Sequence, residues 1–348
     1  MQSKLMKMTA LFSVLFSLAA MSVILYLSAD KVITISDVAQ DEVPVEVEQK
    51  PLSEAENHVL AFELGNANTS YLRIPLPEGC KAENVTIENH YMDQELCILV
   101  QGAEEIFYSE NAISGNRENI VQGSIEAMEN GTRLRFELTG IYEYRTILEN
   151  NDLYVSFLDP REMYDKVVVI DPACGGADTG YVVEGLTEKE INLQIAQKLK
   201  EKLDDTDIKA YYTRMDDVNP KEEERVRLAN ETRADMYIRI QLDALEDQAQ
   251  YGTTTLYNGD YFIPGFGSVE LADALEREVV TSIKGKALGL VEAGAEEYAL
   301  RHVTVPAAAV KAGCVTNKQE VILLEREEYQ DRIAQGIFNA IMAIYDDM

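Results

Sequence analysis

Few side chains in this chain have the types and spacing that metal or nucleophile chemistry usually requires. The three histidines, His58, His90 and His302, are too few for a histidine-rich metal site. The four cysteines are too few for a disulfide scaffold and form no CxxC pair, which excludes a zinc ribbon and a CxxC redox motif. The Gly175-Gly176 pair lacks the lysine and the serine or threonine of a P-loop, so it is not a nucleotide-binding loop of that kind.

The charge balance excludes further classes of function. The 348 residues include 31 Lys+Arg and 61 Asp+Glu, and the formal net charge is −30 at pH 7. This excess excludes a general nucleic-acid binder, because a phosphate backbone must be met by clustered Lys and Arg. It also argues against a polybasic grip on anionic lipid. The length predicts about two domains of roughly 150 residues, each with its own core.

The N-terminal segment predicts export. Residues 8–29 contain no charged side chain, and at about 1.5 Å per residue they span about 33 Å, enough to cross a hydrocarbon core of about 30 Å. Lys4 and Lys7 precede this segment and keep residues 1–7 in the cytoplasm under the positive-inside rule. We expect an uncleaved, single-pass signal anchor in the cell membrane, with the domains that follow outside the cytoplasm. The alternative is a cleaved secretory signal, whose apolar region is usually shorter.

Two segments of different composition follow the anchor. Residues 30–57 contain eight acidic residues, two lysines and two prolines, which predicts a self-repelling, extended acidic linker. From 58 to 160, short apolar runs alternate with turn residues, a pattern typical of an all-β, sandwich-like domain. Cys80 and Cys97 lie in this domain, and the sequence leaves open whether they pair, because it does not fix their geometry.

The C-terminal part, residues 166–348, alternates strand and helix patterns. The β-branched run Val167–Ile170 predicts a buried strand, and Met236–Ile240 predicts another. Strand–helix alternation is typical of parallel β-α-β units. We therefore predict an α/β fold whose mostly parallel sheet is flanked by helices, preceded by the all-β domain and the transmembrane helix.

Two helices of this part have clear sequence signals. Thr187 and Glu190 have the spacing of a capping box, with Thr187 as the N-cap of the first helix. This helix should bury three residues at i, i+4 and i+8: Ile191, Ile195 and Leu199. The last helix is expected over Glu325–Tyr345.

Short motifs follow one another in a fixed order through the C-terminal part. They are Val167–Gly180, Glu188–Leu193, Tyr212–Arg214, Arg225–Asn230, Ala234–Ile240, Leu300-Arg301 and Pro306–Asn317. Together they resemble zinc-dependent N-acetylmuramoyl-L-alanine amidases of the bacterial cell wall. The resemblance implies cleavage of the bond between the lactyl group of muramic acid and the first alanine of the stem peptide. Residues 131–159 resemble the second half of AMIN domains, β modules that localise such amidases, and a generic β domain is the alternative.

The resemblance also implies where the zinc ligands and the general base should lie. The family uses two histidines and a glutamate as ligands, because a Zn²⁺ with an open position polarises the amide carbonyl and activates water. Cys174 stands at the first histidine position, and Gln241 stands at the second, after the residues that correspond to a Ser-Ile pair. Glu188 retains the ligand glutamate, and Lys311 stands where the family has its catalytic glutamate.

These changes disfavour zinc chemistry. A thiolate at Cys174 would bind zinc well, but the neutral amide of Gln241 is a poor ligand. The ammonium of Lys311 cannot act as a base and repels a nearby dication. We therefore expect no cofactor, and we predict an ion pair between Glu188 and Lys311 where the family holds its metal. Asp243, two positions after Gln241, is the candidate for a substitute ligand.

Three functions remain compatible with these residues. The first is a non-enzymatic envelope protein that binds peptidoglycan or a cell-envelope protein. The second is an active amidase with a rebuilt metal site, in which Asp243 joins Cys174 and Glu188. The third is thiol chemistry at Cys174, with Lys311 lowering the pKa of the thiol.

The acids and glycines beside Cys174 have structural interpretations as well. Asp171 and Asp178 could help to bind substrate, and we expect them instead to cap turns beside the glycine pair. Gly175, Gly176 and Gly180 are expected to serve the backbone geometry of the strand-to-helix connection.

Overall fold

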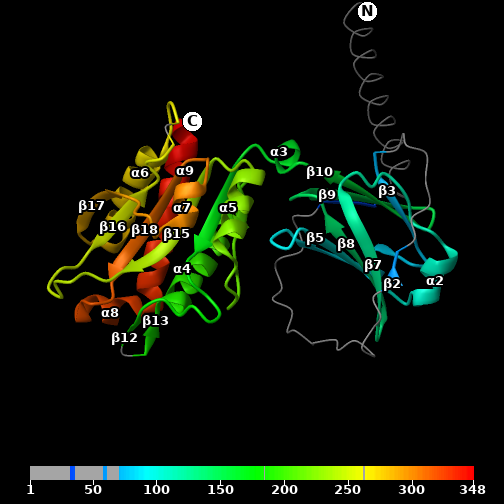
Figure 1. Ribbon diagram of the computed structural model, residues 1–348, viewed down its shortest axis with the longest axis horizontal. Helices are drawn as coiled ribbons and strands as arrows, with labels where there is room; N and C mark the ends of the chain where they lie inside the picture. Colours follow the sequence, from blue (N-terminus) through cyan, green and yellow to red (C-terminus); the bar gives the residue numbers. More distant parts are fainter. Residues whose placement is uncertain (1–31, 36–57, 61–69, 184, 262) are drawn as a thin grey trace, which may run out of the picture. The chain divides into compact units, whose positions relative to one another are not determined.

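The chain divides into two compact units, Met1–Leu158 and Asp159–Met348 (Figure 1). The computed structural model describes residues 32–35, 58–60, 70–183, 185–261 and 263–348. The predicted cytoplasmic tail (1–7) and transmembrane segment (8–29) lie outside the described residues. Among the helices that the structure does describe, none combines the length and the apolar composition needed to cross a membrane.

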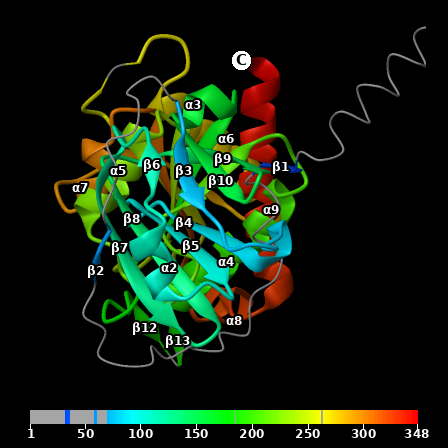
Figure 2. The ribbon, with the colours of Figure 1, turned by 90° about the vertical axis from the view of Figure 1, so that its right-hand side faces the viewer.

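The first unit contains two antiparallel sheets of five strands (Figure 2). In spatial order, the first sheet contains β1 (Val32–Ile35), β9 (Glu143–Glu149), β10 (Asp152–Leu158), β3 (Leu72–Pro75) and β6 (Ser114–Gly115). The second contains β2 (His58–Val59), β7 (Ile120–Met128), β8 (Gly131–Leu138), β5 (Glu95–Gln101) and β4 (Val85–His90). A short helix, α2 (Glu105–Glu110), and a 3₁₀ turn, η2 (Ala82–Asn84), connect them. Strand β1 falls within the segment predicted as an extended linker, and its four β-branched residues pair with β9.

The two sheets share one hydrophobic core, as a β-sandwich does. Leu72 and Val155 of the first sheet belong to the same buried cluster as Ile98 and Phe136 of the second. In β8, alternate side chains from Thr132 to Leu138 are buried, as expected for a strand with one face on a core. All four cysteines of the chain are free, including the two in this unit.

The second unit is built on a six-stranded sheet. In spatial order its strands are β14 (Lys209–Tyr212), β11 (Val167–Pro172), β15 (Met236–Asp243), β18 (Ala307–Cys314), β16 (Thr253–Tyr257) and β17 (Ala287–Glu292). Neighbouring strands are parallel except β16 and β18, which are antiparallel. The predicted, mostly parallel sheet is therefore confirmed. A separate hairpin contains β12 (Val182–Val183) and β13 (Leu186–Thr187).

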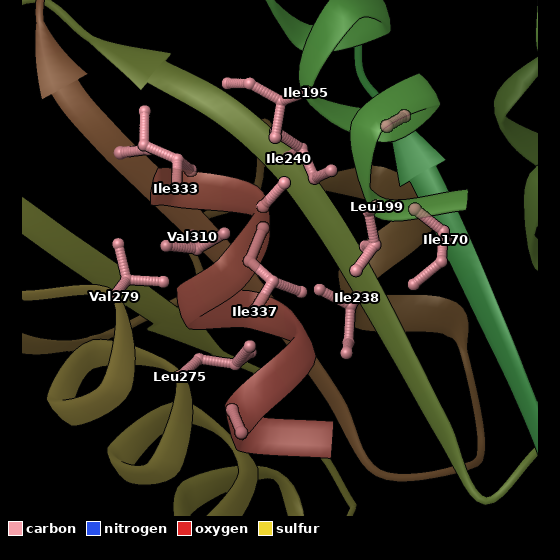
Figure 3. Close-up of a cluster of buried hydrophobic side chains, with 14 of the residues drawn as sticks. Ile170, Ile195, Leu199, Ile238, Ile240, Leu275, Val279, Val310, Ile333 and Ile337 are labelled. Carbon is pink, nitrogen blue, oxygen red and sulfur yellow. The ribbon is translucent and has the colours of Figure 1, made fainter. Parts of the chain in front are cut away.

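The second unit also contains helices. They are α3 (Pro160–Met163), α4 (Glu188–Leu203), α5 (Glu222–Glu231), α6 (Ser268–Ile283), α7 (Tyr298–His302), α8 (Lys318–Leu324) and α9 (Glu327–Asp347). The main core lies between the sheet and α4, α6 and α9 (Figure 3). There, Ile238 and Ile240 of β15 face Leu199, Leu275 and Ile337 from the three helices.

Two sequence expectations for the helices need correction. Thr187 precedes α4 as its N-cap residue, but its hydroxyl makes no capping hydrogen bond and is buried without a partner among the residues that the structure describes. Its extended backbone also belongs to β13, so the hairpin rather than a capping box fixes the start of α4. The last helix begins at Glu327 and ends at Asp347, and a separate helix, α8, precedes it. The predicted burial of Ile191, Ile195 and Leu199 is confirmed.

Candidate functional site

The four positions that the resemblance implies, 174, 188, 241 and 311, lie on elements that meet near the carboxyl ends of the sheet's strands. Cys174 follows β11, whereas Gln241 and Lys311 lie in the carboxyl-terminal halves of β15 and β18. The three strands are parallel neighbours, and Gln241 and Lys311 are direct partners in the ladder. Glu188 is the first residue of α4, which packs on β11 and β15. The carboxyl ends of parallel strands therefore bring these residues to one region.

Glu188 is held by the backbone of two neighbouring segments. Its Oε1 accepts a hydrogen bond from the Leu242 N–H at 2.9 Å, and its Oε2 accepts one from the Tyr181 N–H at 3.1 Å. The side chain is only 5% exposed. Both carboxylate oxygens thus fasten the turn after Gly180 and the end of β15 to the start of α4.

Cys174 lies beside Glu188 as a protonated thiol. A Cβ atom built on Gly180 would lie 2.8 Å from Cys174 Sγ and 2.5 Å from Glu188 Oε2, so both side chains contact this glycine. The pKa of the Cys174 thiol is raised to about 12. Burial makes the largest contribution, and the carboxylates of Glu188 and Asp178 add to it. Lys311 is not among the largest contributors to this shift. The arrangement does not support the nucleophilic thiolate considered from the sequence.

Gln241 is directed toward α7. Its Nε2 donates a hydrogen bond to Glu297 Oε2 at 3.0 Å, and its Oε1 is buried without a hydrogen-bond partner in the described structure. Glu297 is itself only 8% exposed and is the N-cap residue of α7. The amide at the second histidine position is therefore part of a contact between β15 and α7.

Lys311 pairs with Asp243 and not with Glu188. The Lys311 Nζ lies 3.6 Å from Asp243 Oδ1, and Asp243 Oδ2 accepts a hydrogen bond from Thr254 Oγ1 at 3.2 Å. No ion pair joins Glu188 and Lys311 among the described residues, so the predicted pair requires correction. The physical reason is that the Glu188 carboxylate already accepts hydrogen bonds from two backbone N–H groups, whereas the Asp243 carboxylate lies closer to the Lys311 ammonium. Asp243 is thereby engaged elsewhere and does not complete a ligand set with Cys174.

The donor set does not fit zinc. Among residues 70–183, 185–261 and 263–348, no group of three or more His, Cys, Asp and Glu side chains lies close enough to hold a metal ion. The set offers a thiol of raised pKa, a neutral amide and an ammonium beside one carboxylate, and an amide and an ammonium are poor partners for a dication.

A buried charge network beside the site escaped the sequence analysis. Asp171 is fully buried and accepts hydrogen bonds from Thr213, at 2.5 Å, and from Tyr237 and Arg225, while Arg239 Nη1 lies 3.3 Å from its Oδ2. Burial alone raises the pKa of Asp171, but the two guanidinium groups and the two hydroxyls outweigh it and lower this pKa to about 2. Asp171 is therefore the centre of an ion network and caps no turn.

Arg239 extends this network to two helices. Its guanidinium donates two hydrogen bonds to Glu222 of α5, at 2.9 and 3.0 Å, and Glu222 Oε2 also accepts one from the Ala299 N–H of α7. Arg239 occupies the place of the serine in the family's Ser-Ile pair. A charged residue between the apolar residues Ile238 and Ile240 was the signal that could have revealed a buried partner.

The loop after β11 is fixed by its glycines and by one aspartate. Gly175 has φ +135°, and a Cβ there would lie 2.0 Å from the Val218 carbonyl oxygen. Gly176 and Gly180 also have positive φ, as expected for a strand-to-helix connection. Asp178 Oδ1 accepts a hydrogen bond from the Gly180 N–H at 3.0 Å, which confirms its predicted capping role.

Residues 168–343 match the family model described as N-acetylmuramoyl-L-alanine amidase. The sequence is 33% identical over 181 residues to uncharacterized protein YqiI of Bacillus subtilis (strain 168), covering 52% of this chain and 85% of that protein. It is 27% identical over 222 residues to the germination-specific N-acetylmuramoyl-L-alanine amidase of the same organism, covering 60% of this chain and 90% of that protein. The crystal structure of N-acetylmuramoyl-L-alanine amidase from Clostridium difficile 630 aligns with a TM-score of 0.48 and 33% identity, covering 52% of this chain and 97% of that one.

Proposed function

Because the chain belongs to the N-acetylmuramoyl-L-alanine amidase family, we propose that it is a cell-envelope protein whose amidase-fold domain binds peptidoglycan without hydrolysing it. In this proposal residues 8–29 anchor the chain in the cell membrane and both domains lie outside the cytoplasm, an arrangement argued from the sequence alone. The β-sandwich is proposed to be AMIN-like and to help in localisation.

The observation that carries the proposal is the ion pair between Lys311 and Asp243. The resemblance places the general base at position 311, and a general base must accept a proton from water. An ammonium has no free electron pair for a proton, and its charge opposes a dication a few ångströms away. The residue in the base position therefore cannot perform the base's role.

The states of Gln241 and Cys174 support the same proposal. The Gln241 amide nitrogen donates to Glu297, so this side chain acts as a structural donor at a position where the family places a ligand. Burial and the nearby carboxylates raise the pKa of the Cys174 thiol to about 12, so forming the thiolate that zinc binds costs more here than at an exposed cysteine. Of the family's ligand set only Glu188 keeps its type, and its two oxygens bind backbone N–H groups.

The proposal is tested on the purified full chain after zinc loading and dialysis. We expect zinc well below one per chain, no stem peptide released from muropeptides, and co-sedimentation of the folded protein with purified peptidoglycan sacculi. Failure to sediment with sacculi would overturn the binding part of the proposal.

The second candidate function is an active amidase with a rebuilt site, which the retained Glu188 beside Cys174 favours. About one zinc per chain, lost on Cys174→Ser or Glu188→Gln, together with release of stem peptide, would establish this candidate and overturn the silent site.

A further inference from the structure

A groove with an apolar floor lies on the second unit, away from the residues of the amidase site. It has a volume of about 510 Å³ and lies between α6, α9 and β17. α6 and α9 lie side by side in Figure 1. Its apolar lining is Phe266, Val269, Ala274, Leu290, Ala343 and Ile344. Val269 is 47% exposed, so part of this lining is open to a partner.

The rim of the groove is acidic. Glu270, Asp273 and Asp347 line it together with a single cation, Arg277. That cation is already engaged, because Arg277 Nη1 lies 3.1 Å from Asp273 and its Nε lies 3.2 Å from Glu278. Asp347 makes no ion pair with any residue that the structure describes. The rim thus offers carboxylates in excess of the positive charge that the groove itself supplies.

The carboxyl end of α9 strengthens this negative potential. The last turn of α9 contains Asp346 and Asp347 and has no basic residue. The carboxyl end of a helix carries a partial negative charge, so acids there are unfavourable unless a cation lies nearby. A positively charged partner at the groove would supply that cation.

Electrostatics also limits what the occupant can be. The chain's own segment 30–57 contains eight acidic residues and two lysines, so the rim repels it. A second copy of this chain carries a formal charge of −30 and is repelled as well. We propose that the groove docks an amphipathic, basic segment of a partner protein, with an apolar side chain against Val269 and Leu290 and with Lys or Arg against Asp347.

The proposal is tested with a defined probe, because the partner is unidentified. The probe is a fluorescent amphipathic peptide of leucine and lysine, about 14 residues long, which is near the length at which an isolated helix becomes stable. Its matched control has every lysine replaced by glutamate. Binding to the full chain is measured at about 150 mM salt, where general charge attraction is screened over about 8 Å. We expect saturable binding of the lysine peptide, no binding of the glutamate peptide, and methyl NMR shifts centred on Val269, Leu290 and Ile344.

Paired variants separate the groove from the overall charge of the protein. Asp347→Lys should weaken binding about fivefold, whereas Asp346→Lys, one residue away and outside the lining, should change it less than about twofold. Val269→Asp should weaken binding about tenfold, whereas the same change at Ile322, an exposed residue of α8, should leave it within about twofold. Equal losses in both members of a pair, or NMR shifts spread over the whole surface, would overturn the proposal. Absence of saturable binding to the folded chain would overturn it too.

Discussion

Lys311 and Asp243 form an ion pair between β18 and β15, with Nζ 3.6 Å from Oδ1. The Asp243 side chain is 12% exposed and the Lys311 side chain 22%, so water screens this pair only in part. The pair places an ammonium at the position where the family has its base. It connects the adjacent central strands β15 and β18 in their carboxyl-terminal halves and thereby gives the site a structural role.

Loss of the Lys311 ammonium should destabilise the fold. Lys311→Met leaves the mostly buried Asp243 carboxylate without its cation, and we expect the free energy of unfolding to fall by about 1–3 kcal/mol. Urea denaturation monitored by circular dichroism measures this. The control is a cycle with Asp243→Asn, in which the double variant should lose less than the sum of the two single losses. Additive losses would contradict a direct interaction.

Restoring the family residues should restore zinc binding. The variant Cys174→His/Gln241→His/Lys311→Glu, with Asp243→Asn to remove a like charge beside the new carboxylate, is expected to bind about one zinc per chain. Glu297 is already placed to accept an N–H at position 241, and a metal-bound imidazole is typically oriented by such a carboxylate. Zinc content after dialysis is the measurement.

The control for this variant adds Glu188→Gln. That change removes the only carboxylate ligand retained from the family, so bound zinc should fall well below one per chain. Equal zinc content with and without Glu188 would show that the metal binds elsewhere.

Glu188 should contribute to stability even without a metal. Glu188→Gln replaces one carboxylate oxygen with an amide NH₂ group, which cannot accept the hydrogen bond from the backbone N–H of Tyr181 or Leu242. We therefore expect the free energy of unfolding to fall by about 1–3 kcal/mol. Glu190→Gln is the matched control, because Glu190 is exposed on the same helical turn. Thermal denaturation and hydrogen exchange at Leu242 report the effect. Equal stability of the two variants would contradict a stabilising role for the hydrogen bonds that the Glu188 carboxylate accepts.

Asp171 should make the second unit sensitive to acid. Its pKa in the folded state, about 2, lies below its ordinary value of 3.8, so its stabilising contribution is complete above about pH 4 and is lost as the pH falls toward 2. The free energy of unfolding should fall by about 2 kcal/mol over this range of pH. Carboxyl NMR titration of the intact protein measures the pKa directly. Asp171→Asn should flatten the pH dependence and Asp205→Asn, at an exposed site, should not; a carboxyl that titrates near 4 would refute the network.

The sequence by itself determined the fold class and the place of the site. The β-branched run Val167–Ile170 and the buried spacing of Ile191, Ile195 and Leu199 predicted a buried strand followed by an amphipathic helix, and both are present. Such patterns are local, because burial on one face repeats with the period of the strand or helix. The positions at strand ends could also be predicted, since parallel strands bring their carboxyl ends to one edge.

Only the tertiary structure decided which side chains pair. Gln241 meets Glu297 across 56 residues, and Lys311 meets Asp243 instead of Glu188. The ladder of β15 and β18 shifts its register between Gln241 and Asp243, and this irregularity changes which side chains face one another. Partner choice among charged groups depends on distances of a few ångströms and on which backbone N–H groups are already used. These quantities are set by packing between distant segments, and no local pattern in the sequence encodes them.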